Sequence, residues 1–157
     1  MISVTHLGFP RIGARRELKL ALESFWKGDT PAQALHDTAH DLRERHWRLA
    51  REAGADVVPC NDFSLYDHVL DTAVLFDAIP APYREVYDEN PRSGYFALAR
   101  GLQDGRRDLH ALEMTKWFDT NYHYLVPQFE PDQRFVLRGD KPLAELAQAR
   151  ALGIQAR

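Results

Sequence analysis

Short apolar runs along this chain alternate with longer stretches in which apolar residues recur every three or four positions. The runs that predict strands are residues 4–7, 55–59, 112–117 and 135–138. Because helical crossovers join neighbouring strands of a parallel sheet, this order predicts an α/β fold with right-handed connections. Four strands and a last helix would make about half of a larger α/β architecture.

The stretches between these runs predict five helices, at about residues 15–27, 31–53, 65–76, 95–101 and 140–153. The apolar positions predict which residues face the core. They are Leu18, Leu22 and Phe25; Leu35, Ala39, Leu42, His46 and Leu49; Leu65, Val69, Ala73 and Phe76; and Leu143, Leu146, Ala147 and Leu152. Ser64 with Asp67 is expected to cap the third helix. The polar residues 80–94 and the charged residues 103–108 predict surface loops.

The start of the first helix is unusually basic. Arg11, Arg15, Arg16 and Lys19 lie close together, and only Glu17 opposes them. A helix N-terminus already carries partial positive charge and free N–H groups, so cations there repel it. An anion bound at this place would explain the arrangement, and a solvated basic helix start is the alternative.

Composition makes this basic stretch a local feature. The 157 residues carry a net charge of −3 and are 45% hydrophobic, which gives no overall basic field for nucleic acid or an anionic membrane. The sequence has no long apolar run and no secretory signal pattern, and a single cysteine fits a reducing compartment. We therefore expect a soluble cytoplasmic protein.

Two other features offer chemistry only weakly. His36 and His40 have a spacing that can bind a metal on a helix, but no third ligand is evident, so a polar helix face is the favoured interpretation. Cys60 lies in a predicted strand-to-helix loop together with Asn61 and Asp62. It could be a nucleophile, although nothing nearby marks it as activated, and a packed thiol is favoured.

Three blocks carry a resemblance to a known family: GFPRIGARRELKLALESFWKG, NDFSLYDHVLDTA and ALEMTKWFDTNYHYLVP. They resemble, in register over residues 7–153, the N-terminal region of cobalamin-independent methionine synthase. That family has two (β/α)8 barrels, so the resemblance implies a partial TIM barrel of roughly the first four strands with their helices. Residues 1–157 would be the N-terminal half of the N-terminal barrel, without the catalytic C-terminal barrel.

The resemblance also implies a function. The family transfers a methyl group from 5-methyltetrahydropteroyltriglutamate to homocysteine and makes methionine, using zinc held in the C-terminal barrel by His, Cys and Glu or Cys ligands. The residues that match its binding site for the folate glutamate tail are Arg16, Glu17, Leu18, Lys19, Lys116 and Asn121. No catalytic residue and no zinc ligand are expected in this chain, which would be inactive alone.

Two further expectations concern partners. A half-barrel would leave strand edges unpaired, so we expect the chain to contact the rest of its own protein or to self-associate. The alternative to an enzyme fragment is a stand-alone module on a half-barrel that binds small anions such as polycarboxylates or phosphates. A reading frame that continues past Arg157 would favour the fragment, and a stop codon there the module.

Overall fold

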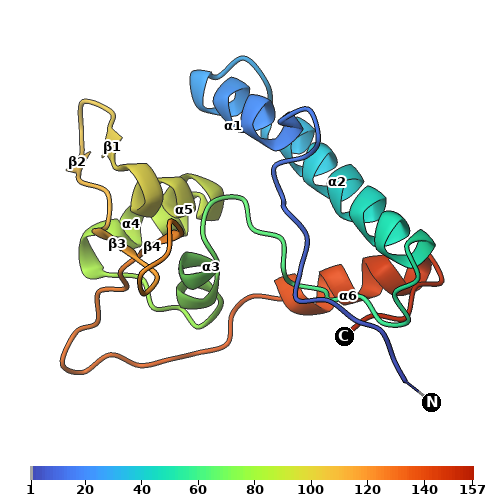
Figure 1. Ribbon diagram of the computed structural model, residues 1–157. Coiled ribbons are helices and arrows are strands. Elements are labelled where there is room, and N and C mark those ends of the chain that lie inside the picture. The colour runs from blue at the N-terminus through green and yellow to red at the C-terminus, as the bar shows by residue number, and fades with distance from the viewer. Residues whose placement is uncertain (1) are drawn as a thin grey trace. The chain divides into compact units, whose positions relative to one another are not determined.

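The computed structural model describes residues 2–157, and within them the chain forms six helices and two small antiparallel sheets (Figure 1). Contacts divide these residues into two compact units. The first combines residues 2–65 with residues 141–157, and the second is residues 66–140. The second unit is therefore inserted in sequence between two parts of the first. The chain is mixed α/β, as its sequence predicts.

Two helices dominate the first unit: α1 (Glu17–Lys27) and α2 (Ala32–Glu52), which pack against each other. The turn between them contains Gly28, at φ 80°, and Pro31, whose fixed φ suits the start of α2. The predicted faces are largely confirmed, because these positions are buried: Leu18, Leu22, Leu35, Ala39, Leu42 and His46. Leu49 departs from the prediction and is 48% exposed.

Three short segments of the first unit pair in parallel. Thr5 pairs with Val57, and Val58 pairs with Ala156 on its other side. Two of the four predicted strands, residues 4–7 and residues 55–59, are thus joined, but only by an isolated bridge. The third segment, residues 155–157, follows α6 (Lys141–Ala151) and lies outside every predicted strand.

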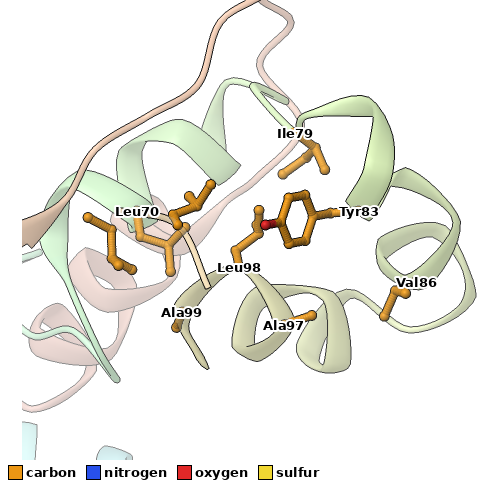
Figure 2. Close-up of a cluster of buried hydrophobic side chains, with 9 residues drawn as sticks. Leu70, Ile79, Tyr83, Val86, Ala97, Leu98 and Ala99 are labelled. Carbon is orange, nitrogen blue, oxygen red and sulfur yellow. The ribbon is translucent and has the colours of Figure 1, made fainter. Parts of the chain in front are cut away.

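The second unit is built on three helices: α3 (His68–Leu75), α4 (Ala81–Glu89) and α5 (Pro91–Arg100). Figure 2 shows side chains of all three pointing toward one another around Leu98. The core residues are Leu70, Ile79, Tyr83, Val86, Ala97, Leu98, Ala99, Leu112 and Leu125. Their burial removes apolar surface from water and so stabilises this unit.

The helix α4 and the start of α5 correct the prediction of a surface loop at residues 80–94. Pro80 is the N-cap residue of α4, and Pro82 and Pro91 lie in first turns, so their missing N–H groups remove no helical hydrogen bond. Asn90 ends α4 and caps α5, since its side-chain oxygen accepts N–H bonds from Arg92 and Ser93, each at 3.0 Å. Gly94 allows the two helices to approach closely, because a Cβ there would collide with the backbone of Tyr87.

Two antiparallel hairpins complete the second unit. The first pairs β1 (Leu102–Gln103) with β2 (Asp108–Leu109) and contains the loop predicted at residues 103–108. The second pairs β3 (Met114–Lys116) with β4 (His123–Leu125). The prediction of a buried parallel strand at residues 112–117 is wrong, because β3 is antiparallel and exposed at all three positions.

The fourth predicted strand is also absent. Residues 135–138 run beside the end of α3, where the N–H of Val136 donates to the carbonyl of Phe76 and that of Arg138 to Leu75. They form no ladder, and the side chains of Phe135, Val136 and Leu137 are exposed. The structure of residues 2–157 therefore does not confirm a four-stranded half-barrel; its parallel pairing is limited to the two bridges of the first unit.

Two helices present different faces from those predicted. α3 begins after Asp67, which caps it by accepting the N–H of Leu70, and the buried residue is Leu70, whereas Phe76 is 41% exposed. In α6 the buried residues are Glu145 and Ala149, and Leu143 is 69% exposed. The inward face of α6 thus contains the charged residue Glu145, so the apolar positions alone do not indicate which face is buried.

Candidate functional site

The basic start of α1 has a strained backbone. Arg16 is the N-cap residue and adopts the left-handed conformation, at φ 63°, which costs a non-glycine residue about 1–2 kcal/mol. Its own N–H donates to the carbonyl of Gly13, and the N–H of Leu18 donates to Ile12. These bonds hold the turn that precedes the helix and direct the Arg16 side chain to the exposed surface.

Glu17 is the internal anion of this site. Its carboxylate accepts the backbone N–H of Arg15 at 2.9 Å and lies 2.8 Å from the Arg45 guanidinium of α2. The backbone N–H groups of Glu17 itself and of Arg15, and then Arg45, lower the pKa of Glu17 from 4.5 to about 2. The positive end of α1 thus already has a carboxylate from its own chain.

Replacing Glu17 by Gln is expected to change how stability depends on pH. A carboxylate whose pKa is lowered on folding stabilises the native state above its ordinary pKa of 4.5, and this contribution is lost as the pH falls toward about 2. The thermal midpoint of the variant should therefore lie below that of the unchanged chain at pH 6, and the gap should close by pH 2. Glu52→Gln, on the exposed end of α2, is the control, and a gap that does not vary with pH would contradict the assignment.

The four predicted residues at this helix start have different surroundings. Leu18 is 1% exposed, so its side chain packs in the core and only its backbone could meet a ligand. Lys19 is partly exposed and forms a surface ion pair with Glu23 at 3.4 Å, which is weak enough to exchange for another anion. Arg16 has no ion pair among residues 2–157. Arg16 and Lys19 are therefore the side chains that can offer positive charge.

A groove of about 780 Å3 lies beside this helix start, between the turn at residues 9–14 and the outer face of α2. Phe9 is fixed at its edge, since its ring stacks on buried His46 at 4.3 Å and its N–H donates to Asp62 at 2.8 Å. Burial and then Arg45 lower the pKa of His46, although Asp62 and Glu17 oppose this shift. Arg45 also lines the groove, and no pattern in the sequence indicates this role because only the fold brings Arg45 to Glu17.

The other two predicted residues lie on the second hairpin. Lys116 ends β3 opposite His123, and Asn121 lies in the exposed turn between the strands. The carbonyl oxygen of Asn121 lies 3.0 Å from Nδ1 of His123. Because a carbonyl oxygen can only accept a hydrogen bond, Nδ1 of His123 is the donor. Lys116 has no ion pair among the described residues, so its ammonium is available to an anion.

Aromatic rings surround this hairpin turn. The Trp117 ring meets those of Phe118 and Tyr124 edge to face, and Phe118 is 83% exposed. A shallow pocket of about 380 Å3 lies between the turn and α3 and is lined by His68, Val69, Thr72, Trp117 and Tyr122. The predicted binding residues thus form one group at the start of α1 in the first unit and another on this hairpin in the second.

The side chains of Cys60, His36 and His40 do not make a reactive or metal-binding centre. Burial, together with Glu145 and Asp62, raises the pKa of the Cys60 thiol to about 11, so it is a poor nucleophile and metal ligand. His36 and His40 lie on the exposed surface of α2 beside Asp37 and Asp41. Across residues 2–157 no three His, Cys, Asp or Glu side chains gather as metal ligands would. In the same part of the chain, every helix is too short or too polar to span a bilayer.

A family model described as "Cobalamin-independent synthase, N-terminal domain" matches residues 3–157. The chain belongs to this family. The proteins similar to it include one from Xylella fastidiosa (strain M23), 68% identical over 157 residues, which are 100% of this chain and 21% of that protein. Another, from Bifidobacterium animalis subsp. lactis, is 53% identical over 148 residues, 94% of this chain and 19% of its own length. A third, from Caulobacter vibrioides, is 50% identical over 171 residues, 99% of this chain and 22% of its own.

Each of these three relatives is named a 5-methyltetrahydropteroyltriglutamate–homocysteine methyltransferase. The present chain therefore corresponds to the N-terminal part of this family of synthases and spans about a fifth of the length of the relatives it matches.

Proposed function

We propose that this chain is the N-terminal part of an enzyme that transfers a methyl group from 5-methyltetrahydropteroyltriglutamate to homocysteine and so makes methionine in the cytoplasm. The observation that carries the proposal is the 68% identity, over the whole chain, to a relative named for this reaction. Family membership at this level of identity supports a shared reaction far better than a shared fold would.

The role proposed for the predicted binding residues of this chain is to hold the glutamate tail of the folate. The tail carries several carboxylates, and Arg16, Lys19 and Lys116 offer positive charge on exposed surfaces, with the Asn121 amide as a hydrogen-bond donor. Glu17 and Leu18 contribute differently. Glu17 fixes the helix start through Arg15 and Arg45, and Leu18 anchors it in the core.

The chemical step is proposed to belong to a part of the enzyme beyond these residues. The family's zinc does not fit here, because the one thiol has a raised pKa and its neighbours Glu145 and Asp62 are engaged with Asn61 and Phe9. The three parallel segments of the first unit are proposed to be the beginning of a (β/α)8 barrel. This proposal is supported by the parallel pairing of the segments and by the helices that lie between them in sequence, as helices do between the strands of such a barrel.

Two assays test this proposal together. The protein encoded by the complete reading frame should form methionine from 5-methyltetrahydropteroyltriglutamate and homocysteine. The 157-residue chain alone should bind γ-linked triglutamate in a calorimetric titration and form no methionine. A complete protein without this activity would refute the function, and methionine made by the chain alone would refute the division of roles.

A further inference from the structure

The hairpin that carries Lys116 and Asn121 is too small to hold its own shape. Its strands pair over three positions, and its turn is exposed, with Trp117 at 47%. An isolated two-stranded hairpin is marginally stable at best in water. Some contact from outside the hairpin must therefore fix the turn if its polar groups are to keep one arrangement.

That contact comes from Asp67, the residue that caps α3. Asp67 is 2% exposed, and its Oδ2 accepts the N–H of Leu70 at 2.8 Å and that of Leu125, in β4, at 3.3 Å. Its Oδ1 accepts the hydroxyl of Tyr122, in the hairpin turn, at 2.8 Å. One buried carboxylate thus binds the start of a helix, the end of a strand and the turn. Hydrogen bonds to a charged acceptor are the strong ones.

Tyr122 joins this carboxylate to the part of the turn that holds Lys116. Its backbone carbonyl accepts the N–H of Trp117, the residue after Lys116, at 2.8 Å. Its backbone N–H donates to the hydroxyl of Thr120 at 3.2 Å, and that hydroxyl donates to the carbonyl of Trp117. Moving Tyr122 would therefore move the backbone that follows Lys116 and the backbone on both sides of Asn121.

Asp67 also contacts α5, through the hydroxyl of Tyr95. Its N–H lies 3.5 Å from the hydroxyl of Tyr95, a residue of α5, and that hydroxyl donates to Asp71 at 2.6 Å. The position of the carboxylate is thus set by α3 and α5, which belong to the core of the second unit. Rigid elements of this kind position a binding group more closely than a loop does.

We propose that Asp67 and Tyr122 are positioning residues for the glutamate-tail site, and that their hydrogen bond holds the turn so that Lys116 and Asn121 face one carboxylate together. This inference rests on the proposed function, because it assigns Lys116 and Asn121 to the same ligand. Asp67 is 2% exposed and its carboxylate is bonded to groups of the protein, so it can act on a ligand only through the turn.

The test compares two variants that each remove one hydroxyl from the hairpin. Tyr122→Phe deletes the bond to Asp67, whereas Tyr124→Phe deletes a hydroxyl that has no partner among residues 2–157. Titration of the 157-residue chain with γ-linked triglutamate should show binding up to about tenfold weaker for Tyr122→Phe, because ligand binding must then order a turn that the bond to Asp67 no longer holds. Tyr124→Phe should bind as the unchanged chain does.

A double-mutant cycle separates positioning from general destabilisation. If Tyr122 acts through Lys116, Tyr122→Phe should weaken binding far less in a chain that already carries Lys116→Met. Hydrogen exchange of residues 117–122 should be faster in Tyr122→Phe than in Tyr124→Phe. These two results would support the inference even if both variants melt at the same temperature.

Three outcomes would overturn the inference. Equal binding by the two tyrosine variants would show that the bond to Asp67 does not position the site, while the tail site itself would stand. A loss from Tyr122→Phe that is undiminished beside Lys116→Met would show that Tyr122 does not act through Lys116. No binding of triglutamate by the unchanged chain would refute the tail site in this chain, and the positioning role would fall with it.

Discussion

Reversing the charges of Arg16 and Lys19 to Glu together is expected to weaken triglutamate binding severely while leaving the fold intact. Each lost cation–carboxylate contact should cost roughly 1–3 kcal/mol of binding free energy. Both side chains lie at the surface, and among residues 2–157 the one ion pair broken is the exposed Lys19–Glu23 pair. The free energy of unfolding should therefore change by less than about 1 kcal/mol.

Calorimetric titration with γ-linked triglutamate and with free glutamate would measure this effect. Lys27→Glu is the matched control, since it reverses a charge at the other end of α1 and should leave binding unchanged. The loss should be greater for triglutamate, because one carboxylate cannot reach both cations as a chain of carboxylates can. Equal losses for the two ligands would mean that Arg16 and Lys19 do not recognise the tail.

Replacing Glu145 by Ala is expected to destabilise the first unit by about 3–5 kcal/mol, the usual effect of removing one partner from a buried ion pair. Glu145 is 4% exposed in α6, accepts the N–H of Asn61 at 3.0 Å, and lies 3.3 Å from Lys141 and 3.9 Å from Arg43. Burial raises the pKa of Glu145 even though Lys141 and Arg43 oppose this, and burial lowers the pKa of Arg43. Burial thus opposes the charged form of both groups, and Glu145→Ala would leave the Arg43 guanidinium buried without this nearby carboxylate.

Urea unfolding of three variants would test this account. Glu145→Ala should lose several kcal/mol, and the double variant Arg43→Met with Glu145→Leu should regain much of that loss because it buries no unpaired charge. Glu44→Ala breaks the exposed Glu44–Arg48 pair on α2 and should cost less than about 1 kcal/mol. If Glu145→Ala lowers the free energy of unfolding no more than Glu44→Ala does, the buried contacts of Glu145 with Arg43 and Lys141 do not support the first unit.

The parts of the fold that the sequence predicted well are those decided by local pattern. α1 and α2 carry enough turns for their apolar stripes to be read directly, and most of the predicted faces are buried. The start of α3 was misplaced because two residues could cap it, and the fold uses Asp67, whose carboxylate also binds Leu125 far along the chain. The prediction of a buried strand at residues 112–117 fails because a short apolar run does not indicate which segment it will pair with.

The candidate site shows the same division. Its basic helix start was visible as an excess of charge, and Lys116 and Asn121 came from the resemblance to the family. The ion pair between Glu17 and Arg45 at that helix start could not be predicted, because Arg45 reaches Glu17 only once α1 and α2 pack. The bond between Asp67 and Tyr122 likewise joins residues with no shared pattern in the sequence.

The ribosome finishes residues 66–140 before it makes the segment that pairs with Val58. Contacts between near neighbours, such as Met114 with Leu125, close sooner than contacts between distant ones, since closing a longer loop loses more chain entropy. Ala156 can reach Val58, and Glu145 can reach Asn61, only after the whole inserted unit has emerged. In a nascent chain stopped just before residue 141, the second unit would therefore have all of its residues. The first unit would lack α6 and the segment that pairs with Val58.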